Sequence, residues 1–369
     1  MGIPEKIKAV QDEIGRTQLN KATEHHVGIL KAKIAKLKRE QEAVQIKKSS
    51  KKSDGFDVKR SGDATVVIIG LPSVGKSTLL NALTGSKSSV GAFQFTTVTV
   101  VPGILDYRGA KIQMLDLPGI IKGASSGKGL GKRILSVARS ADIILLVLDV
   151  FQPYHENVLV NELSNIGIRL NQKPPNILIE KSSTGGIAIA QQVKLKKMSE
   201  KLVKDILNIY GYTSARVVIR EDIDSEQLID FITGSKTYAK SITVLNKIDL
   251  VDEKFLKKAS KKIKTEFIPV SADANDNITE LRDRIYDELQ FIRIYMRPKG
   301  GKTDYKEPLI IRKGNSVLDV CNKLHRKLKK DFRYGLVWGK SVKFAGQRVG
   351  RNHVLRDEDV LTIIKIKGT

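Results

Sequence analysis

The sequence lacks most of what an extracellular or membrane protein needs. Its 369 residues contain one cysteine, Cys321, which excludes an internal disulfide and any cysteine-cluster metal site. The pattern around Cys321 indicates a core position. There is no run of 18 apolar residues, no N-terminal signal segment and no lipidation motif, so neither a membrane span nor secretion is predicted. We therefore expect a soluble, cytoplasmic protein that does not bind a membrane.

Acidic residues are also scarce, most of all at the two ends of the chain. The formal net charge is +25. Residues 1–60 carry 15 Lys and Arg against 8 Asp and Glu, and residues 300–369 carry 17 against 7. A solvated surface is the plain explanation for lysine-rich segments. The alternative is contact with a polyanion, above all RNA such as that of the ribosome.

A phosphate-binding loop is the most informative motif that is present. It reads G-x-x-x-x-G-K-S and lies between an apolar run at 66–69, which suits a buried strand, and a segment at 78–83, which suits a helix closed by Gly85. In such an arrangement backbone N–H groups and the helix N-terminus face phosphates, Lys76 adds a positive charge, and the Ser77 hydroxyl binds magnesium. The nucleotide-binding residues predicted here are Gly70, Leu71, Pro72, Ser73, Val74, Gly75, Lys76, Ser77 and Thr78.

A second motif narrows the choice of base. Asn246-Lys247-Ile248-Asp249 follows a strand predicted at 242–245 and resembles the N-K-x-D guanine-specificity motif of GTPases. The Asp249 carboxylate can accept hydrogen bonds from guanine N1–H and the 2-amino group. Adenine lacks this donor pair, so a buried carboxylate left unpaired disfavours ATP. Ser271-Ala272 follows further on, in the place where an S-A pair supports the base edge in GTPases.

Two segments between these motifs are candidates for the switch regions. Asp116-Leu117-Pro118-Gly119 follows the apolar run 112–115 and gives D-x-x-G, and Phe95-Thr96-Thr97 lies upstream in a segment with loop character. Taken singly, both patterns are common. Four motifs in this order, each near a predicted strand end, predict a GTPase.

At this point the chain resembles a particular family. G-x-P-S-V-G-K-S-T-L-L-N, F-T-T-x-T-x-x-P-G and D-L-P-G-I-I-x-G-A resemble the developmentally regulated GTP-binding proteins, in the Obg-related branch of translation-factor GTPases. The glycine-rich segment 123–131 and a basic C-terminal domain extend the resemblance to essentially the whole chain. The resemblance implies that Ser77 and Thr97 ligate Mg²⁺, that Asp116 holds it through water, and that the Gly119 N–H senses the γ-phosphate. It makes Lys76, Thr97 and Gly119 the expected catalytic residues, and it adds to the nucleotide-binding set Asp116, Leu117, Pro118, Gly119, Asn246, Lys247, Asp249, Ser271 and Ala272.

One expected catalytic residue is missing. Ras-like proteins carry a glutamine directly after D-x-x-G to orient the attacking water, and this chain has Ile120. An isoleucine side chain cannot hydrogen-bond to water, so slow hydrolysis is predicted unless something else supplies the function. The resemblance suggests K⁺ or a bound partner. Many potassium-using GTPases have Asn at the position of Ser73, which argues against K⁺ here.

The predicted fold is α/β: a Ras-like P-loop GTPase domain, formed by residues 61–173 and 241–292, with additions. Apolar residues at helical spacing within 1–60 predict a helical hairpin, followed by a flexible basic linker from Lys47 to Ser61. The spacing between motifs leaves about 65 residues, at 174–240, beyond the roughly 30 that a β-α-β unit needs. Their strand and helix patterns predict an inserted small α/β subdomain, and the resemblance likens it to part of ribosomal protein S5. This insertion is either an RNA or partner contact or a structural brace.

Residues 300–369 form the last addition. Strands expected at 309–312 and 360–366, with a helix at 317–328, resemble the TGS domain, a ubiquitin-like β-grasp. Several aromatic residues in it alternate with Lys and Arg. Stacking on RNA bases is one role for them, and core packing is favoured for most. These aromatic residues are Phe332, Tyr334, Trp338 and Phe344.

The sequence therefore predicts a magnesium-dependent GTPase that binds GTP and GDP, hydrolyses GTP slowly, and acts as a switch on ribosomes or in translation. By resemblance, a regulatory protein partner is expected. One alternative is a nucleotide-gated scaffold whose hydrolysis is incidental; Ile120 favours it and the intact magnesium motifs oppose it. Another is an ATPase, as some Obg relatives are, which the intact N-K-x-D motif opposes.

Overall fold

The computed structural model describes residues 2–18, 20, 23–48, 62–85, 101–117, 130–234 and 236–366. The chain divides into two compact units, which we describe separately. The small unit contains Met1–Phe56 and Gly167–Tyr238, and the large unit contains Asp57–Ile166 and Ala239–Thr369. None of the helices in the described parts of the chain has both the length and the apolar character that a membrane span requires.

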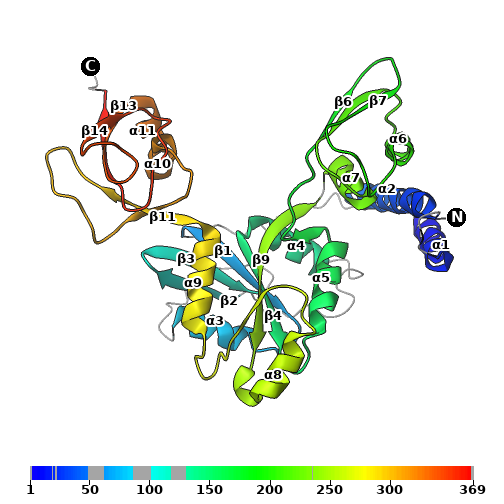
Figure 1. The fold of residues 1–369 in the computed structure, drawn as a ribbon, viewed down its shortest axis with the longest axis horizontal. Coiled ribbons are helices and arrows are strands. Elements are labelled where there is room, and N and C mark those ends of the chain that lie inside the picture. The colour runs from blue at the N-terminus through cyan, green and yellow to red at the C-terminus, as the bar shows by residue number, and fades with distance from the viewer. Residues whose placement is uncertain are drawn as a thin grey trace. The chain divides into compact units, whose positions relative to one another are not determined.

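A twisted central sheet forms the middle of the large unit (Figure 1). Its strand order is β10-β9-β4-β1-β3-β2, and a short strand β5 also pairs with β9. All neighbours on the main path are parallel except β2, which pairs with β3 in the antiparallel direction. The strands are β1 (Ala64–Gly70), β2 (Val101–Tyr107), β3 (Ala110–Asp116), β4 (Ile143–Asp149), β5 (Ile168–Leu170), β9 (Thr237–Asn246) and β10 (Phe267–Pro269).

Continuous apolar runs make these strands, because a parallel sheet is covered on both faces. Every residue of β1 is buried. Val66 and Ile68 belong to the same core cluster as Leu79 of α3 and Leu281 of α9, whereas Val67 and Ile69 point to the opposite face. Helices α4 and α5 pack on β1 and β4. The helices of this region are α3 (Lys76–Thr84), α4 (Leu130–Ser140), α5 (His155–Asn165), the 3₁₀ turn η1 (Ile248–Leu250), α8 (Glu253–Ser260) and α9 (Ile278–Leu289).

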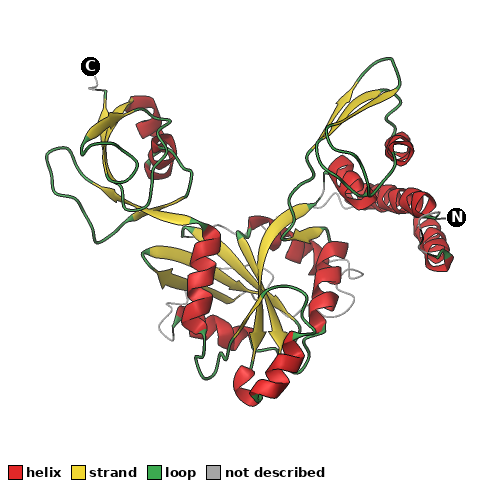
Figure 2. Ribbon diagram, in the orientation of Figure 1, coloured by secondary structure: helices red, strands yellow, loops and turns green. Residues whose placement is uncertain are grey.

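A second sheet at the C-terminus, of order β12-β11-β15-β13-β14, packs on a helix, as in a β-grasp (Figure 2). It includes β11, which lies upstream of residue 300. The predicted helix at 317–328 is interrupted: His325 is extended (φ −168°, ψ 135°), and its Nδ1 accepts a hydrogen bond from the Lys327 N–H at 3.1 Å, which starts a second short helix. The elements are β11 (Phe291–Met296), β12 (Leu309–Arg312), α10 (Val317–Leu324), α11 (Arg326–Asp331), β13 (Phe332–Trp338), β14 (Gln347–Val349) and β15 (Val360–Lys365).

The C-terminal aromatic residues mostly do not form a core, contrary to the prediction. Only Phe332 packs against the apolar cluster of this sheet, which includes the buried Cys321. Tyr334 lies under the guanidinium of Arg348, and Trp338 lies under that of Arg297. Phe344 is 65% exposed. Arginine side chains thus cover two of these rings from within the chain.

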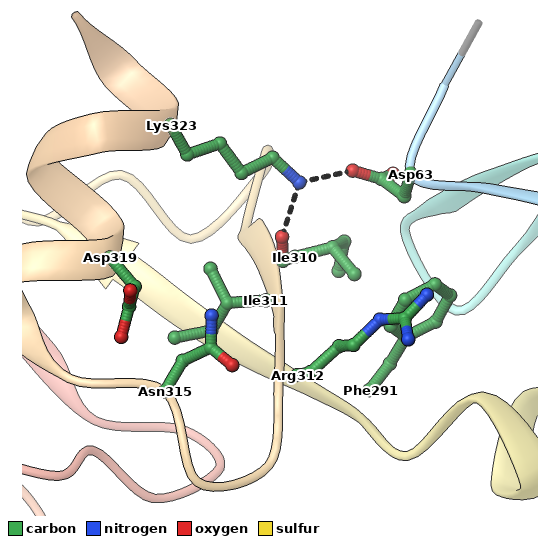
Figure 3. Close-up of a pocket in the computed structure, with 8 residues that line it drawn as sticks. All are labelled: Asp63, Phe291, Ile310, Ile311, Arg312, Asn315, Asp319 and Lys323. Carbon is green, nitrogen blue, oxygen red and sulfur yellow. Dashed lines mark hydrogen bonds and ion pairs between the residues drawn. The ribbon is translucent and has the colours of Figure 1, made fainter. Parts of the chain in front are cut away.

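Apolar packing and ion pairs between side chains join the C-terminal sheet to the central sheet. Phe291 and Ile310 belong to the core cluster of the central sheet rather than to their own. Lys323 on α10 donates to the Asp63 carboxylate at 2.6 Å and to the Ile310 carbonyl, across a cavity of about 190 Å³ (Figure 3). Arg312 pairs with Asp142. The amino-terminal end of β1 is therefore fixed to the β-grasp sheet.

The small unit combines the N-terminal hairpin with the insertion. The hairpin helices are α1 (Ile3–Arg16) and α2 (Glu24–Lys48), and the insertion contains β6 (Ile177–Lys181), β7 (Ile187–Gln191), α6 (Glu200–Ile209), β8 (Ala215–Ile219) and α7 (Ser225–Thr233). Its strands pair in the order β6-β8-β7. Helix α2 packs on α6 and α7, and Ala32 lies fully buried in the insertion's core.

Polar contacts fix the same interface. His25 on α2 bonds to Asp205 on α6 at 3.0 Å, and Lys31 pairs with Glu226 on α7. The apolar patterns at 176–180, 186–190 and 215–219 predict β6, β7 and β8, and the pattern at 198–210 predicts α6, whereas α7 was not predicted. Helix α2 also extends to Lys48, into the segment expected to be a linker. The insertion therefore gives α2 an apolar surface on which its buried face can pack.

Candidate nucleotide-binding site

The predicted motifs come together at one edge of the central sheet, because each follows the carboxyl end of a parallel strand. In the strand register, Gly70 is opposite Val147, Ile68 is opposite Asp116, and Asp149 is opposite Asn246. The glycine loop after β1, the D-x-x-G start after β3 and the N-K-x-D segment after β9 are therefore neighbours in space.

The backbone of the glycine loop requires its small residues. Gly75 and Ser73 have positive φ, 87° and 65°, a region that glycine adopts without strain. A Cβ on Gly75 would lie 2.4 Å from Asn246 Nδ2, and one on Gly70 would lie 2.6 Å from the Val147 carbonyl oxygen. Both glycines are therefore fixed by close contact with the neighbouring strands, and the loop leads directly into α3.

The amino group of Lys76 lies inside this loop. Lys76 is the first residue of α3 and is buried, and its Nζ donates to the Leu71 carbonyl at 3.0 Å. Burial lowers the pKa of Lys76, and the negative charge of Asp116 raises it in part. A buried cation held by one loop carbonyl is well placed to meet an anion at the N-terminus of α3.

Ser77 and Asp116 form a pair of hard oxygen donors beside Lys76. The Ser77 hydroxyl donates to Asp116 Oδ2 at 2.7 Å. Asp116 is buried, and its other oxygen, Oδ1, has no hydrogen-bond partner among the described residues. A buried carboxylate oxygen left unpaired is costly, and carboxylate and hydroxyl oxygens are the ligands that Mg²⁺ prefers. These residues therefore fit a magnesium ion or the water bound to it.

Asn246 connects the glycine loop to the S-A segment. Its Nδ2 donates to the Val74 carbonyl at 3.0 Å, and its Oδ1 accepts from the Ala272 N–H at 3.1 Å. Asn246 is 2% exposed, so both bonds are shielded from water. Asp249 lies on η1 directly afterwards and is exposed to solvent. Ser271 is fully buried, and its hydroxyl accepts from the Ala274 N–H at 3.0 Å.

Lys247 has a carboxylate partner that the motifs did not reveal. Its Nζ donates to the Ser73 carbonyl at 2.8 Å and pairs with Asp149 Oδ2 at 2.7 Å. Asp149 Oδ1 also accepts from the Phe151 N–H at 2.9 Å. Asp149 is the last residue of β4. Its position at the end of a strand that lies beside β9 was the only feature of the sequence that could have indicated a partner for Lys247.

A buried glutamate supports the strand that leads to Ser271 and Ala272. Glu156 on α5 is 2% exposed and accepts hydrogen bonds from the Thr265 hydroxyl and from the Lys264 and Thr265 N–H groups. Thr265 lies two residues before the start of β10. Sequence patterns gave no sign of this contact, because it joins residues more than a hundred positions apart.

Several predicted site residues lie outside the described residues. These are Thr97, Pro118 and Gly119, together with Ile120 and the glycine-rich segment at 123–129. The described part of the site thus consists of the glycine loop, Lys76, Ser77, Asp116, Leu117 and the base-side residues from Asn246 to Ala272.

Comparison with known proteins agrees with this geometry. Residues 65–181 match the family described as "50S ribosome-binding GTPase", residues 184–291 match the C-terminal region of that domain, and residues 292–365 match the TGS domain. An uncharacterised GTP-binding protein of Methanocaldococcus jannaschii is 51% identical, over 99% of this chain and 93% of its own. Developmentally-regulated GTP-binding protein 2 of Homo sapiens is 43% identical over 99% of this chain and 100% of its own. A homologue of that protein in Dictyostelium discoideum is 45% identical with the same coverage.

The chain belongs to the developmentally regulated GTP-binding protein family. Membership of this family confirms the predicted Ras-like GTPase fold with an inserted subdomain and a C-terminal TGS domain. It also makes the chain a GTP-binding GTPase of the Obg-related class. GTPases of this kind use Mg²⁺, and the pair Ser77 and Asp116 supplies suitable oxygen donors.

Proposed function

We propose that this GTPase is a slow GTP-hydrolysing switch that acts on ribosomes or in translation, in the cytoplasm. The observation that carries the nucleotide part is the convergence of a buried lysine, a carboxylate with one unpaired oxygen, and an asparagine that links two loops, all at one sheet edge. Each of the three is at a position where a GTPase needs a phosphate, magnesium or base contact.

In this proposal the loop amides and Lys76 hold the β- and γ-phosphates of GTP and stabilise the charge that develops during transfer. Ser77 and Thr97 are the metal ligands, and Asp116 acts through water. Magnesium, when bound, neutralises charge on the β- and γ-phosphate oxygens. The Gly119 N–H contacts the γ-phosphate, so it is the proposed sensor of GTP against GDP.

The base is held from the other side of the site. Asp249 accepts from the guanine N1–H and 2-amino groups, while Lys247 stays in place through Asp149 and the Ser73 carbonyl. The Ala272 N–H, fixed by Asn246, borders the base edge. The proposed arrangement selects GTP over ATP because Asp249 is left unpaired by adenine.

The ribosomal part of the proposal rests on charge and on family. Residues 300–369 carry 17 Lys and Arg against 7 Asp and Glu, and the matched family is described as ribosome-binding. On α11, the side chains of Lys327, Lys329 and Lys330 are exposed. These three form the proposed RNA contact of the C-terminal domain, and the N-terminal basic segment is a second candidate.

Charge reversal of the α11 lysines tests this contact better than truncation does. Ile310 belongs to the core cluster of the central sheet, so removal of residues 300–369 would damage the GTPase itself. Exchange of all three lysines for glutamate should weaken co-sedimentation with ribosomes and lower its salt dependence, because a protein that neutralises fewer phosphates releases fewer counterions. GTP binding should be unchanged. Ribosome binding that is insensitive to salt and to the exchange would refute the RNA contact.

A nucleotide-gated scaffold is the second candidate, and Ile120 is the residue that favours it. Steady-state turnover of GTP and ATP, with and without ribosomes, separates the two. A ribosome-stimulated GTP turnover supports the switch, whereas nucleotide-dependent binding with unstimulated turnover supports the scaffold. The same assay in KCl and in NaCl tests K⁺ as an activating ion, and addition of a co-purifying partner protein tests the partner as the source of the missing catalytic group.

A further inference from the structure

Helix α8 and the turn after β4 carry an exposed aromatic and basic surface that the nucleotide site does not use. Phe151 follows β4 and is 49% exposed, and Phe255 on α8 is 41% exposed. Their ring centroids lie 5.8 Å apart, at an interplanar angle of 58°. Two phenylalanines that contact each other in solvent form an apolar patch rather than two isolated exposed side chains.

Exposed lysines also lie on α8 and just beyond the end of the helix. Lys254 and Lys258 are exposed and lie four residues apart on the helix, and Lys258 follows Phe255 by three, so it neighbours the Phe255 ring on the helix surface. Lys261 and Lys262 follow where the helix ends and are exposed as well. We call Phe151, Phe255 and these four lysines the α8 surface.

Three of the acidic residues close to the α8 surface have partners of their own, whereas Asp249, just before α8, is exposed. Asp252 caps α8 by accepting from the Phe255 N–H at 2.7 Å, and Glu253 pairs with Lys257. Glu266 pairs with Arg284. Among the described residues, no ion pair involves any of the four lysines of the α8 surface. In the described parts of the chain, the amino groups of these four lysines are therefore not held by a carboxylate.

We propose that the α8 surface binds single-stranded RNA. The inference deepens the proposed function, because it names a contact on the GTPase domain itself, apart from the basic ends. Four exposed lysines without ion pairs among the described residues attract a phosphate backbone, and exposed phenylalanine rings offer faces on which unpaired bases stack. Solvation alone does not explain two exposed phenylalanine rings in contact with each other. A protein-binding surface does not explain the lysines, because protein interfaces are normally depleted in lysine. Both observations favour RNA over an acidic polypeptide.

The surface also borders the base side of the nucleotide site. The Phe151 N–H donates to Asp149, which pairs with Lys247, and α8 begins shortly after Asp249. RNA on the α8 surface would thus lie next to the segment that holds guanine. Binding is therefore best measured with the protein loaded with GDP and, separately, with a non-hydrolysable GTP analogue.

Fluorescence anisotropy of the full-length protein with a labelled single-stranded RNA of 20 nucleotides tests the proposal. One variant reverses Lys254, Lys258, Lys261 and Lys262 to glutamate. We expect it to bind at least tenfold more weakly, with a salt slope smaller by about 0.7 for each phosphate that it no longer neutralises. The matched control reverses four exposed lysines of the small unit, for the same change in net charge, and should bind more tightly than the α8 variant: Lys194, Lys196, Lys201 and Lys204.

A second variant, Phe255→Ala, separates stacking from charge. It should weaken RNA binding roughly 5- to 150-fold and leave the salt slope unchanged, since every lysine that neutralises a phosphate is still present. GDP affinity and thermal unfolding of every variant show that the fold and the nucleotide site are intact. If Phe255→Ala unfolds the protein, Phe151→Ser provides the same test from the other ring.

The outcomes distinguish this inference from the proposed function. The inference would be overturned if the lysine variant bound RNA as tightly as its matched control and Phe255→Ala bound RNA as tightly as the wild type, even if the wild type sediments with ribosomes. RNA binding as in wild type, combined with lost binding of polyglutamate, would identify a docking site for an acidic protein and would also overturn it. A wild type that neither sediments with ribosomes nor changes its turnover in their presence would refute the proposed function instead.

Discussion

Replacement of Asn246 by alanine should disturb two loops of the nucleotide site at once. The change removes the donor to the Val74 carbonyl and the acceptor for the Ala272 N–H, at 3.0 and 3.1 Å in the structure. Asn246 is 2% exposed, so water cannot replace it freely. Each buried group left unpaired costs about 1–3 kcal/mol, and the total of about 2–6 kcal/mol is shared between folding and nucleotide binding.

Two measurements account for that total. Urea unfolding gives the loss of stability, and titration with a fluorescent GDP analogue gives the loss of affinity, in which about 2 kcal/mol corresponds to roughly 30-fold. Asn246→Asp is the matched variant: it keeps an acceptor for Ala272 but places an oxygen against the Val74 carbonyl, so it should damage mainly the glycine loop. Stability within about 0.5 kcal/mol and affinity within about twofold of wild type, for both variants, would show that the linkage is not needed.

Four further changes test other parts of the site. Asp249→Asn should lower GTP affinity more than 100-fold, by about 3 kcal/mol or more, and improve binding of xanthine nucleotides, as competition titrations can measure. Ser77→Asn should weaken GTP more than GDP and raise the Mg²⁺ concentration needed for GTP binding; equal affinities for both nucleotides, as in wild type, would contradict its role. Ile120→Ala should leave single-turnover hydrolysis nearly unchanged and well below about 1 s⁻¹, and a collapse of hydrolysis with intact binding would give the isoleucine a catalytic role. Lys76→Met should abolish GTP binding but raise the nucleotide-free melting temperature at neutral pH. The pKa of the Lys76 ammonium is lowered in the folded protein, so the folded protein binds its proton more weakly than the unfolded chain does. The free energy of unfolding of the wild type should therefore rise with pH between the lowered pKa and the ordinary lysine pKa, and that rise should be absent in the variant.

Sequence patterns were sufficient where the structure is local. The run 66–69 lies within β1 and is wholly buried, and Gly85 closes α3, because a strand, a glycine turn and a helix follow from neighbouring residues. The grouping of the motifs at one edge followed from the parallel order of the strands. These parts of the site needed no knowledge of distant contacts.

Contacts between distant residues were what the sequence could not supply. Asp149 pairs with Lys247 and Glu156 accepts a hydrogen bond from Thr265; only the strand-end position of Asp149 gave any indication of a partner, and the sequence near Glu156 gave none. The break at His325 was missed because the apolar spacing continues through it, while the extended backbone there depends on a side-chain cap. Core packing was predicted for most of the C-terminal aromatic residues by residue type alone, yet Phe344 lies on a loop and is 65% exposed.

Because α2 packs on the insertion, it cannot complete its packing during synthesis until α6 and α7 have been made. His25 and Asp205 are separated by 180 residues, and Lys31 and Glu226 by 195. At roughly 5–20 residues per second, a translating ribosome would take on the order of 10 to 40 seconds to deliver α6 and α7 after α2. For that interval Ala32, together with Ile29 and Ala35, lacks the insertion core on which it packs in the finished protein. Helix α2 is thus synthesised long before it can pack on the insertion. Until α6 and α7 have been synthesised, its apolar face is accessible to chaperones or to non-native contacts.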